Sequence, residues 1–340
     1  MARPALFSGK TFKTLYLSAG TSVLVRSSLA LAAAALVTAP LPAQDVNISI
    51  RVDSIEALFR AKDFEILDWM DTRFEGDRTQ RVVLRFEDST KALAKWAMAP
   101  REGIGVFNNQ PRYEIAAYEF QKLFLDEPEY VVPPTVARCV SVHRYREMQH
   151  SAHATFSGTE SVLVILQYWL WNVTSDDVWD KGRFERDTVY ARHFANLNLF
   201  TFLIRHSDAN RGNVLISSIS SNPRIFAVDN GVAFSRREES DRGTKWRRLA
   251  VKRLPRKTVD RLRAVTREEL DRHLSVVAQF RQIGDQLVPM APTEPLFSGL
   301  GVRRTGDVVQ LGLTDDEIGE IWGRIQKVLD EVDEGKIVLF

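Results

Sequence analysis

Two polar motifs, each next to a run of apolar residues, constrain this chain more than any other feature. The first, His206–Asn213, reads HSDANRGN and follows a mainly apolar run; the second, Val228–Gly231, reads VDNG and ends another. This order predicts a helix, a polar loop, two short strands and an aspartate at a strand end. A structure of that kind places the polar residues of both motifs in loops, where a rigid scaffold can hold them for chemistry.

The spacing of the acidic and amide residues in these motifs indicates phosphoryl transfer. An Asp, an Asn five residues later and a second Asp are the residues that orient an attacking hydroxyl and hold magnesium in such sites. We therefore interpret Asp208 as the catalytic aspartate, and Asn213 and Asp229 as metal ligands. His206 is interpreted as structural, because magnesium prefers oxygen ligands. Each motif alone is also compatible with an ordinary turn.

A site of this kind also needs a cation for the nucleotide phosphates and an acid that holds the cation. Lys95 lies in the middle of a predicted strand between apolar neighbours, where a lysine is costly to bury without a partner. Glu114 lies at the start of the next predicted helix, so we predict an ion pair between Lys95 and Glu114. Lys91, placed in the preceding turn, and Glu119, further along the helix, are the competing residues. An edge-strand lysine that reaches solvent is the alternative for Lys95.

The remaining nucleotide contacts are predicted from a turn and a strand end. The turn Glu75–Arg78 contains Gly76, whose backbone would contact the phosphates, although any hairpin turn can contain a glycine. The apolar strand Ser161–Leu170 contains Gln167 and Tyr168, whose backbone groups would pair with the adenine edge; an ordinary buried strand end is equally consistent. The predicted cofactors are ATP and Mg²⁺ or Mn²⁺.

The pattern along the chain predicts an α+β protein of two lobes with a protein-kinase-like fold. Three runs with strand-like alternation form an antiparallel meander: Phe64–Met70, Arg81–Phe86 and Ala92–Ala97. From Tyr190 onward the pattern is mainly helical, with amphipathic helices at Thr266–Gln282 and Asp315–Val332. We therefore predict a β-rich N-lobe over residues 44–170 and a mostly helical C-lobe over residues 171–340.

The N-terminus has the pattern of a secretory signal peptide. Basic residues up to Arg26 precede a short apolar stretch that ends in small residues near Ala43. The expectation is a cleaved signal peptide over residues 1–43, with an uncleaved signal anchor as the alternative. Since the apolar run is short for a membrane span, no stable span is expected after cleavage. The predicted location is the secretory pathway or another extracytoplasmic compartment: secreted, in the Golgi lumen, or membrane-associated through an uncleaved N-terminus.

Charge and cysteine content limit the partners and the covalent structure. The formal net charge of +2 over 340 residues gives no basis for a nucleic-acid partner, and none is expected. Cys139 is the single cysteine, so the chain cannot form an internal disulfide even in an oxidising compartment.

Several stretches resemble a known family of kinases. They are Glu114–Tyr118, Val132–Arg138, Phe202–Ile204 and Val228–Phe234. They resemble the atypical secretory-pathway kinases of the Golgi casein kinase and glycan xylosyl kinase group, and more distantly the phosphatidylinositol 3-/4-kinase-like and HipA-type kinases. The resemblance spans about residues 55–240. It implies an ATP-dependent kinase fold that acts in a secretory or extracytoplasmic compartment. The five site residues and the signal-like N-terminus together predict transfer of the ATP γ-phosphate to a protein or glycan hydroxyl.

The resemblance assigns the same residues by position, with two departures. It makes Lys95 and Glu114 the ion pair and Asp208 the catalytic aspartate. It makes Asn213 and Asp229 the metal ligands. That family usually has Asp-Arg-His in the catalytic loop, whereas this chain has Asp-Ala-Asn, and its animal members carry disulfides that this chain cannot form. The alternatives are a pseudokinase that binds nucleotide or activates a partner, and a kinase of lipids or small molecules.

Overall fold

The computed structural model describes residues 45–71, 79–103, 110–234, 250–296 and 299–340. Residues 44–340 form one compact unit. The predicted signal peptide and Gly76 lie outside the described residues. Within the described ranges, no helix combines the length and the apolar character that crossing a membrane requires.

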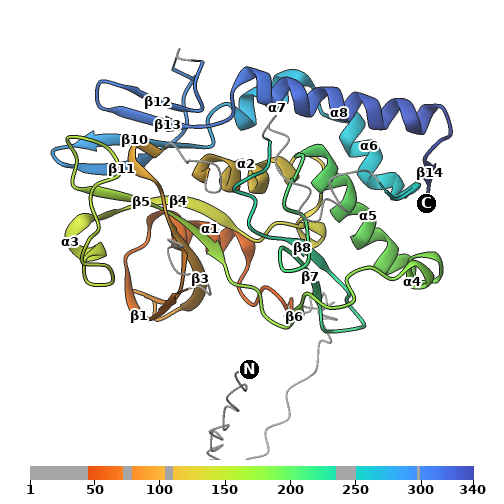
Figure 1. The fold of residues 1–340 in the computed structure, drawn as a ribbon, viewed down its shortest axis with the longest axis horizontal. Helices are drawn as coiled ribbons and strands as arrows, with labels where there is room; N and C mark the ends of the chain where they lie inside the picture. The colour runs from red at the N-terminus through yellow and green to blue at the C-terminus, as the bar shows by residue number, and fades with distance from the viewer. Residues whose placement is uncertain (1–44, 72–78, 104–109, 235–249, 297–298) are drawn as a thin grey trace, which may run out of the picture. The chain divides into compact units, whose positions relative to one another are not determined.

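A five-stranded antiparallel sheet forms the first lobe, with the strand order β1-β2-β3-β5-β4 (Figure 1). Its strands are β1 (Phe64–Asp71), β2 (Thr79–Phe86), β3 (Lys91–Met98), β4 (Thr135–Ser141) and β5 (Ser161–Tyr168). The first three strands are the predicted meander. Lys91, which the sequence placed in a turn, instead begins β3. The turn before it is shorter because the chain reverses within Glu87–Thr90 and pairing resumes at once.

The two faces of this sheet pack against different helices. Helix α1 (Val52–Ala61) contributes Ile55 and Phe59 to the same buried cluster as Val82 of β2. Helix α2 (Pro111–Gln121) packs on the opposite face, which carries Ala97 and Ile165. Because side chains alternate between the faces of a strand, Lys95 lies on the α2 face, two residues from Ala97.

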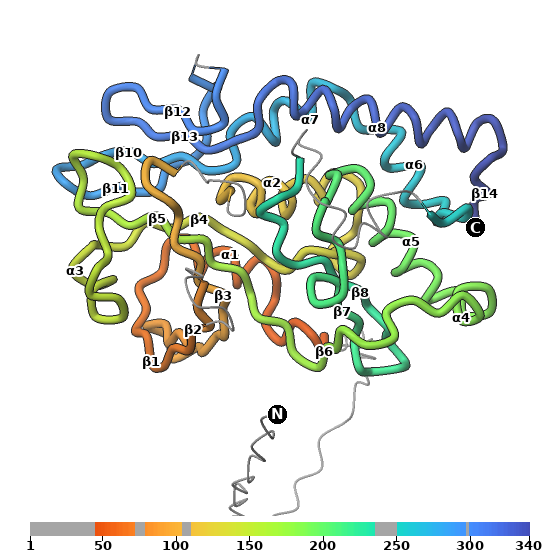
Figure 2. The backbone as a smooth tube through the Cα atoms, viewed as in Figure 1, coloured from red at the N-terminus to blue at the C-terminus, as the bar shows by residue number. Residues whose placement is uncertain are grey.

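The second lobe is mostly helical, with short strands between its helices. Its helices are α4 (Lys181–Arg186), α5 (Thr188–Leu203), α6 (Arg256–Ala264), α7 (Arg267–Leu274) and α8 (Asp315–Asp333). Its short strands are β6 (Val173–Thr174), β7 (Val214–Ser217), β8 (Ile225–Ala227), β9 (Arg253–Leu254) and β14 (Val338–Leu339). Three further short elements come earlier in the chain, between β3 and β5: α3 (Val142–Tyr145) and the 3-10 turns η1 (Arg101–Gly103) and η2 (Glu127–Glu129). Helix α5 is buried along most of its length and runs through the middle of this lobe, below α8 in the view of Figure 2.

One predicted helix is wrong in its second half. The helix expected over Thr266–Gln282 ends at Leu274, and the chain continues into strand β10 (Ala278–Ile283). The apolar residues in the segment fit both the helical and the strand period. The deciding signal is the two-residue turn Gly284-Asp285, in which Gly284 has a φ of 61° and connects β10 to the next strand.

Strand β10 belongs to a second antiparallel sheet that the sequence did not predict. Its other strands are β11 (Gln286–Met290), β12 (Val302–Thr305) and β13 (Val308–Leu311), in the order β11-β10-β13-β12. This sheet lies beside the first one in Figure 1, where β11 contacts β4. The Glu160 N–H donates to the Asp285 carbonyl at 2.6 Å, and the Leu287 N–H donates to Ser161 Oγ at 2.8 Å. These two hydrogen bonds attach the turn and the start of β11 to the start of β5.

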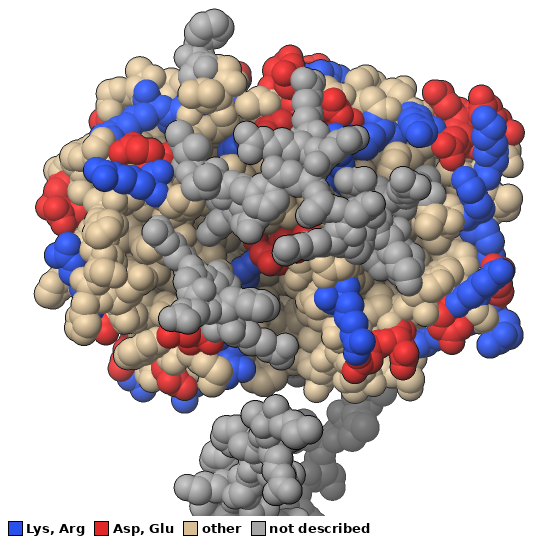
Figure 3. Space-filling view, in the orientation of Figure 1, with Lys and Arg blue, Asp and Glu red and all other residues tan. Residues whose placement is uncertain are grey.

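Charged side chains of both signs are interspersed over the face shown in Figure 3. Several basic side chains between residues 252 and 263 pair with nearby carboxylates. Lys252 pairs with Glu331, Arg253 with Glu185, and Arg263 with Asp333. These pairs fit a solvated, charge-balanced surface.

Candidate functional site

Lys95 is the centre of the site, because two carboxylates from distant parts of the chain meet at its ammonium group. Its Nζ lies 3.0 Å from Glu114 Oε1 and 3.0 Å from Asp229 Oδ1. The Lys95 side chain is only 14% exposed, so these contacts replace the water that an ammonium group loses on burial. Burial by itself would lower the pKa of Lys95, but the two carboxylates outweigh it and hold the pKa above its ordinary value.

Glu114 fixes Lys95 from the first turn of α2. While Oε1 accepts from Lys95, Oε2 accepts the backbone N–H of Asn230 at 3.0 Å. Burial raises the pKa of Glu114, and the Lys95 charge acts in the opposite direction. The competing residues lie elsewhere: Glu119 pairs with Lys122, and Lys91 is exposed at the start of β3. The structure therefore brings Glu114 to Lys95.

Asp208 lies in the loop after α5, and two side-chain amides orient its carboxylate. Asn210 Nδ2 donates to Asp208 Oδ1. Asn213 Nδ2 donates to Asp208 Oδ2 at 2.8 Å and to the Asp208 backbone carbonyl at 3.1 Å. With its nitrogen engaged in this way, Asn213 can present its amide oxygen to a cation.

Asp229 has a left-handed backbone, with a φ of 60°, and a carboxylate that is partly open to solvent. Aspartate is one of the few residues besides glycine that adopt this conformation readily. The Asp229 side chain is 56% exposed although Oδ1 contacts Lys95. The positive charge of Lys95 lowers the pKa of Asp229, so the group stays ionised. It is therefore a carboxylate that can take a further positive partner.

Hydrogen bonds hold the two motifs against each other. The Val228 N–H donates to the Asn213 carbonyl at 2.8 Å. His206 Nε2 lies 3.3 Å from the Val228 carbonyl. His206 is fully buried, and burial lowers its pKa to about 4, so the ring is neutral at pH 7. This arrangement supports the structural interpretation of His206 and makes the positions of Asn213 and Asp229 interdependent.

The residues present fit a hard divalent cation that keeps part of its shell for other oxygens. Asn213 and Asp229 supply an amide oxygen and a carboxylate, which are ligands that Mg²⁺ and Mn²⁺ accept. Across the described ranges, no three His, Cys, Asp or Glu side chains gather into a metal-binding cluster. A cation here would complete its coordination with water and nucleotide phosphates, as Mg²⁺ commonly does in nucleotide sites.

The predicted base-binding segment lies at the end of β5. Gln167 is buried opposite Lys95 on the sheet, and its amide donates to Thr135 Oγ1 at 2.9 Å. The Tyr168 N–H donates to the Pro134 carbonyl at 2.8 Å. Pro134 has no N–H to return to the Tyr168 carbonyl, so the ladder between β4 and β5 ends there.

Three residues around the site were not assigned roles from the sequence. Asn210 orients Asp208, and Asn230 ties its backbone to Glu114. Arg81 lies directly opposite Lys95 on the neighbouring strand. The sequence Asp-Ala-Asn places Asn210 close enough to Asp208 for this contact to be expected. The positions of Asn230 and Arg81 depend on contacts between distant segments, which one sequence does not show.

No family model matches this chain, and no curated protein matches it. Among solved structures, the chain is similar to a hydra Fam20 determined with sugar. The two are 14% identical with a TM-score of 0.53, and the alignment covers 88% of this chain and 95% of that one. A crystal structure of the Golgi casein kinase is 14% identical with a TM-score of 0.50, covering 84% of this chain and 76% of that one. The same kinase with Mn and ADP bound is 12% identical with a TM-score of 0.49.

At these identities the comparison shows the fold. The predicted α+β kinase-like fold is confirmed, and the resemblance to the Golgi casein kinase group holds at the level of fold. Fold alone does not determine chemistry, so the assignment of function depends on the arrangement of the residues described above.

Proposed function

We propose that this protein is an ATP-dependent kinase that transfers the γ-phosphate to a hydroxyl of a protein or glycan. The observation that carries the proposal is Lys95 held between Glu114 and Asp229, with Asp229 attached through its neighbour Val228 to the Asp208 loop. The kinase-like fold supports it.

The charge balance around Lys95 favours a cation and a polyanion as ligands. One ammonium group faces two carboxylates, and the Lys95 charge holds the pKa of the more exposed one, Asp229, below its ordinary value, so Asp229 presents a negative charge to solvent. A divalent cation at Asp229 and Asn213 would neutralise this charge and allow Lys95 to contact nucleotide phosphates. A cluster built only for stability would be expected to balance its charges internally.

Each residue then has a defined task in the reaction. Lys95 binds and orients the phosphates, and Glu114 holds Lys95 in place. Asp208, fixed by Asn210 and Asn213, accepts the proton of the acceptor hydroxyl. The acceptor oxygen forms a bond to the γ-phosphorus while the bond from that phosphorus to the oxygen bridging it to the β-phosphate breaks, which leaves ADP. The bound Mg²⁺ or Mn²⁺ supplies neutralisation of the phosphate charge.

The remaining contacts and the compartment are proposed on narrower grounds. The Tyr168 carbonyl, opposite Pro134, is a candidate acceptor for the base edge, and the turn at Gly76 a candidate phosphate contact. The signal-like N-terminus favours a secretory or extracytoplasmic location, and a protein or glycan acceptor is compatible with it.

The experiment is a transfer assay on the full chain with γ-labelled ATP, Mg²⁺ or Mn²⁺, and separate protein, glycan and lipid acceptor pools. Asp229→Ala should reduce metal-dependent incorporation by about 10³-fold, because it removes a metal ligand and a partner of Lys95. Asp307→Ala is the matched control. Asp307 is also an exposed aspartate near an arginine, 3.5 Å from Arg281 Nε, but lies in the turn between β12 and β13.

Circular dichroism should show that both variants remain folded. Full activity of Asp229→Ala would contradict the proposal. Label in the lipid pool alone would reassign the acceptor. Nucleotide binding without transfer to any pool would identify a non-catalytic nucleotide-binding protein.

A further inference from the structure

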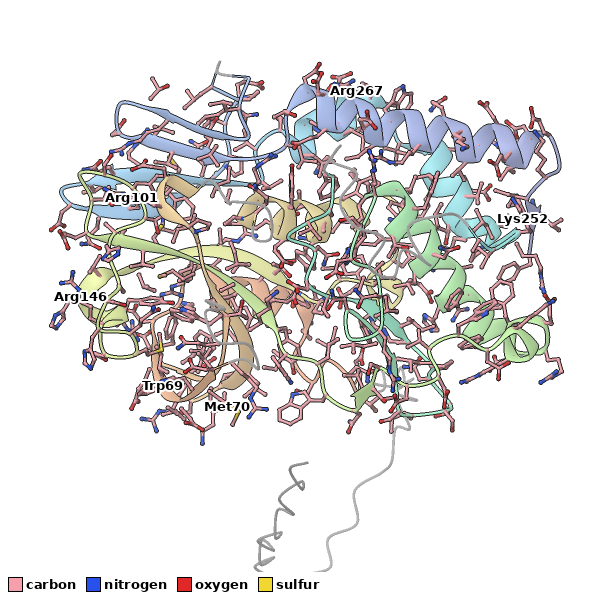
Figure 4. The ribbon with its side chains drawn as sticks, viewed as in Figure 1. Trp69, Met70, Arg101, Arg146, Lys252 and Arg267 are labelled. Carbon is pink, nitrogen blue, oxygen red and sulfur yellow. The ribbon has the colours of Figure 1, made fainter. Side chains whose placement is uncertain are left out.

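Arg81 is a cation on the Lys95 face of the first sheet that takes no part in the acidic cluster. It pairs directly with Lys95 across β2 and β3, so both side chains project from the same face. The Arg81 guanidinium carbon lies 5.6 Å from the centre of the Trp169 ring, and Arg81 Nη2 lies 3.7 Å from Met70 Sδ. The Arg81 guanidinium therefore lies over the sheet face, in contact with side chains from β1 and from the end of β5. Met70 lies at the lower edge of the sheet in Figure 4.

An apolar surface, here called the ledge, lies on the same sheet face, two residues along the strands from the Arg81–Lys95 pair. It consists of Val83, Leu93 and Trp169. Val83 pairs with Leu93, and the Trp169 N–H donates to the Leu93 carbonyl at 2.9 Å, so the three residues form one row across the face. Val83 and Leu93 are half-buried and Trp169 is exposed. Val82 and Leu84, on the opposite face, are fully buried. The ledge is therefore apolar surface that the core leaves uncovered.

The ledge lies next to the phosphate end of the site. Leu93 precedes Lys95 by two residues on one strand, a separation of about 7 Å along the sheet. A ribose can bridge a separation of this size. A nucleotide whose phosphates contact Lys95 would then place its base against the ledge and beside the Arg81 guanidinium.

The partners of Arg81 differ from those of the next arginine on the same strand face. Arg85, four residues on, pairs with the Glu65 carboxylate. In the described parts of the chain, Arg81 has no carboxylate within ion-pair distance and contacts a thioether and an indole instead. A guanidinium stacks readily on aromatic faces and also attracts phosphate. A nucleotide offers both.

We propose that Arg81 and Trp169 form a clamp that stacks on the nucleotide base, a role that rests on the proposed kinase function. In this structure Arg81 lies against the indole. With a nucleotide bound, Arg81 would exchange that contact for the base, and Trp169 would contact the base from the strand end. Stacking does not read the hydrogen-bonding edge of a base. The clamp therefore adds affinity for purine nucleotides without selecting between them.

The test is calorimetric binding of Mg-ATP, Mg-GTP and Mg-tripolyphosphate to the full chain. Arg81→Met and Trp169→Leu should each weaken ATP and GTP binding by about tenfold and by similar factors. Trp169→Leu should leave tripolyphosphate binding unchanged, because that ligand has no base. The matched controls are Arg85→Met, on the same strand face, and Trp171→Leu, an exposed tryptophan two residues after Trp169. Both should bind all three ligands as the wild type does.

The possible results separate the clamp from the kinase function. Wild-type affinity for ATP in both variants would overturn the clamp. Tighter ATP binding by Arg81→Met would also overturn it, because Arg81 would then obstruct the site. Phosphate transfer by the wild type with no effect of Arg81→Met would overturn the clamp and leave the kinase function standing. Nucleotide binding that depends on Arg81 and Trp169, without phosphate transfer, would support the clamp and overturn the kinase function. Failure of the wild type to bind ATP or GTP would overturn both.

Discussion

Both antiparallel sheets bury cations, and two of them, Arg303 and Lys95, have different kinds of partner. In the second sheet, Arg303 of β12 is 6% exposed and donates to the carbonyls of Ser275 and Leu313, at 2.6 and 3.0 Å. In the first sheet, Lys95 is satisfied by Glu114 and Asp229. Burial lowers the pKa of Arg303, whereas the carboxylates hold the pKa of Lys95 above its ordinary value.

The difference shows that burial of a cation does not by itself indicate a functional site. Arg303 joins two backbone segments, and its partners are neutral carbonyl groups. The partners of Lys95 are carboxyl groups, and one of them, the ionised Asp229, presents its charge to solvent. Local charge balance and solvent access therefore distinguish the candidate site from a structural contact.

In the comparison of the two cations, the largest effect is expected when Lys95 loses its charge. Lys95→Met should reduce γ-phosphate transfer by about 10²- to 10³-fold, because the phosphates lose a preorganised cation. The measurement is the initial rate of labelled phosphate incorporation at saturating metal. Lys95→Arg serves as the conservative comparison, since it keeps the charge but changes its geometry. Its transfer rate should lie between those of the wild type and Lys95→Met. Transfer at the wild-type rate by Lys95→Met would remove the distinction between the two cations.

The matching substitution in the second sheet should affect stability instead. Arg303→Met leaves two buried carbonyls without their donors, which should cost about 2–4 kcal/mol in the free energy of unfolding. Phosphate transfer per folded molecule should stay unchanged. Urea unfolding and the transfer assay measure the two quantities. A variant of unchanged stability that loses transfer would show that Arg303 belongs to the functional site.

The same two sheets show how far the sequence predicts the fold. The first three strands were predicted because polar turns separate short runs with period-two alternation. In the second sheet, Val276, Val277 and Phe280 fit a helical period as well as a strand, so α7 was extended too far. The Gly284-Asp285 turn is the local signal for a strand pair at this point.

In the candidate site, too, the sequence predicts some features from local pattern, whereas others depend on contacts between distant residues. Lys95, Glu114, Asp208, Asn213 and Asp229 were selected by residue type and order, and the structure gathers them in one region. Their catalytic and metal-binding roles stay predictions until transfer is measured. The bond from the Asn230 backbone to Glu114 could not be predicted, because it joins residues far apart in the chain. The position of Arg81 depends on strand register, which one sequence does not specify.

The smallest effect concerns His193, a third buried group, which carries no charge at neutral pH. Burial lowers the pKa of His193 to about 3, and Arg224 and Arg192 act in the same direction. The unfolded chain, with an ordinary histidine pKa of about 6.5, takes up the proton first as the pH falls. Stability from this group is therefore complete above pH 6.5 and lost as the pH falls towards 3. Between pH 7 and pH 5 the loss should be about 1–2 kcal/mol.

Urea unfolding at several pH values would measure this slope, and His193→Gln should reduce it without abolishing it. His206, whose pKa burial lowers to about 4, contributes a slope of the same sign and remains in the variant. An unchanged slope in His193→Gln would mean that the His193 ring accepts a proton in the folded state. Glu129 is the acid in position to stabilise it, since its Oε2 lies 3.5 Å from His193 Nδ1. His193 would then resemble Lys95 more than Arg303, because a carboxylate and not its buried position would determine its charge.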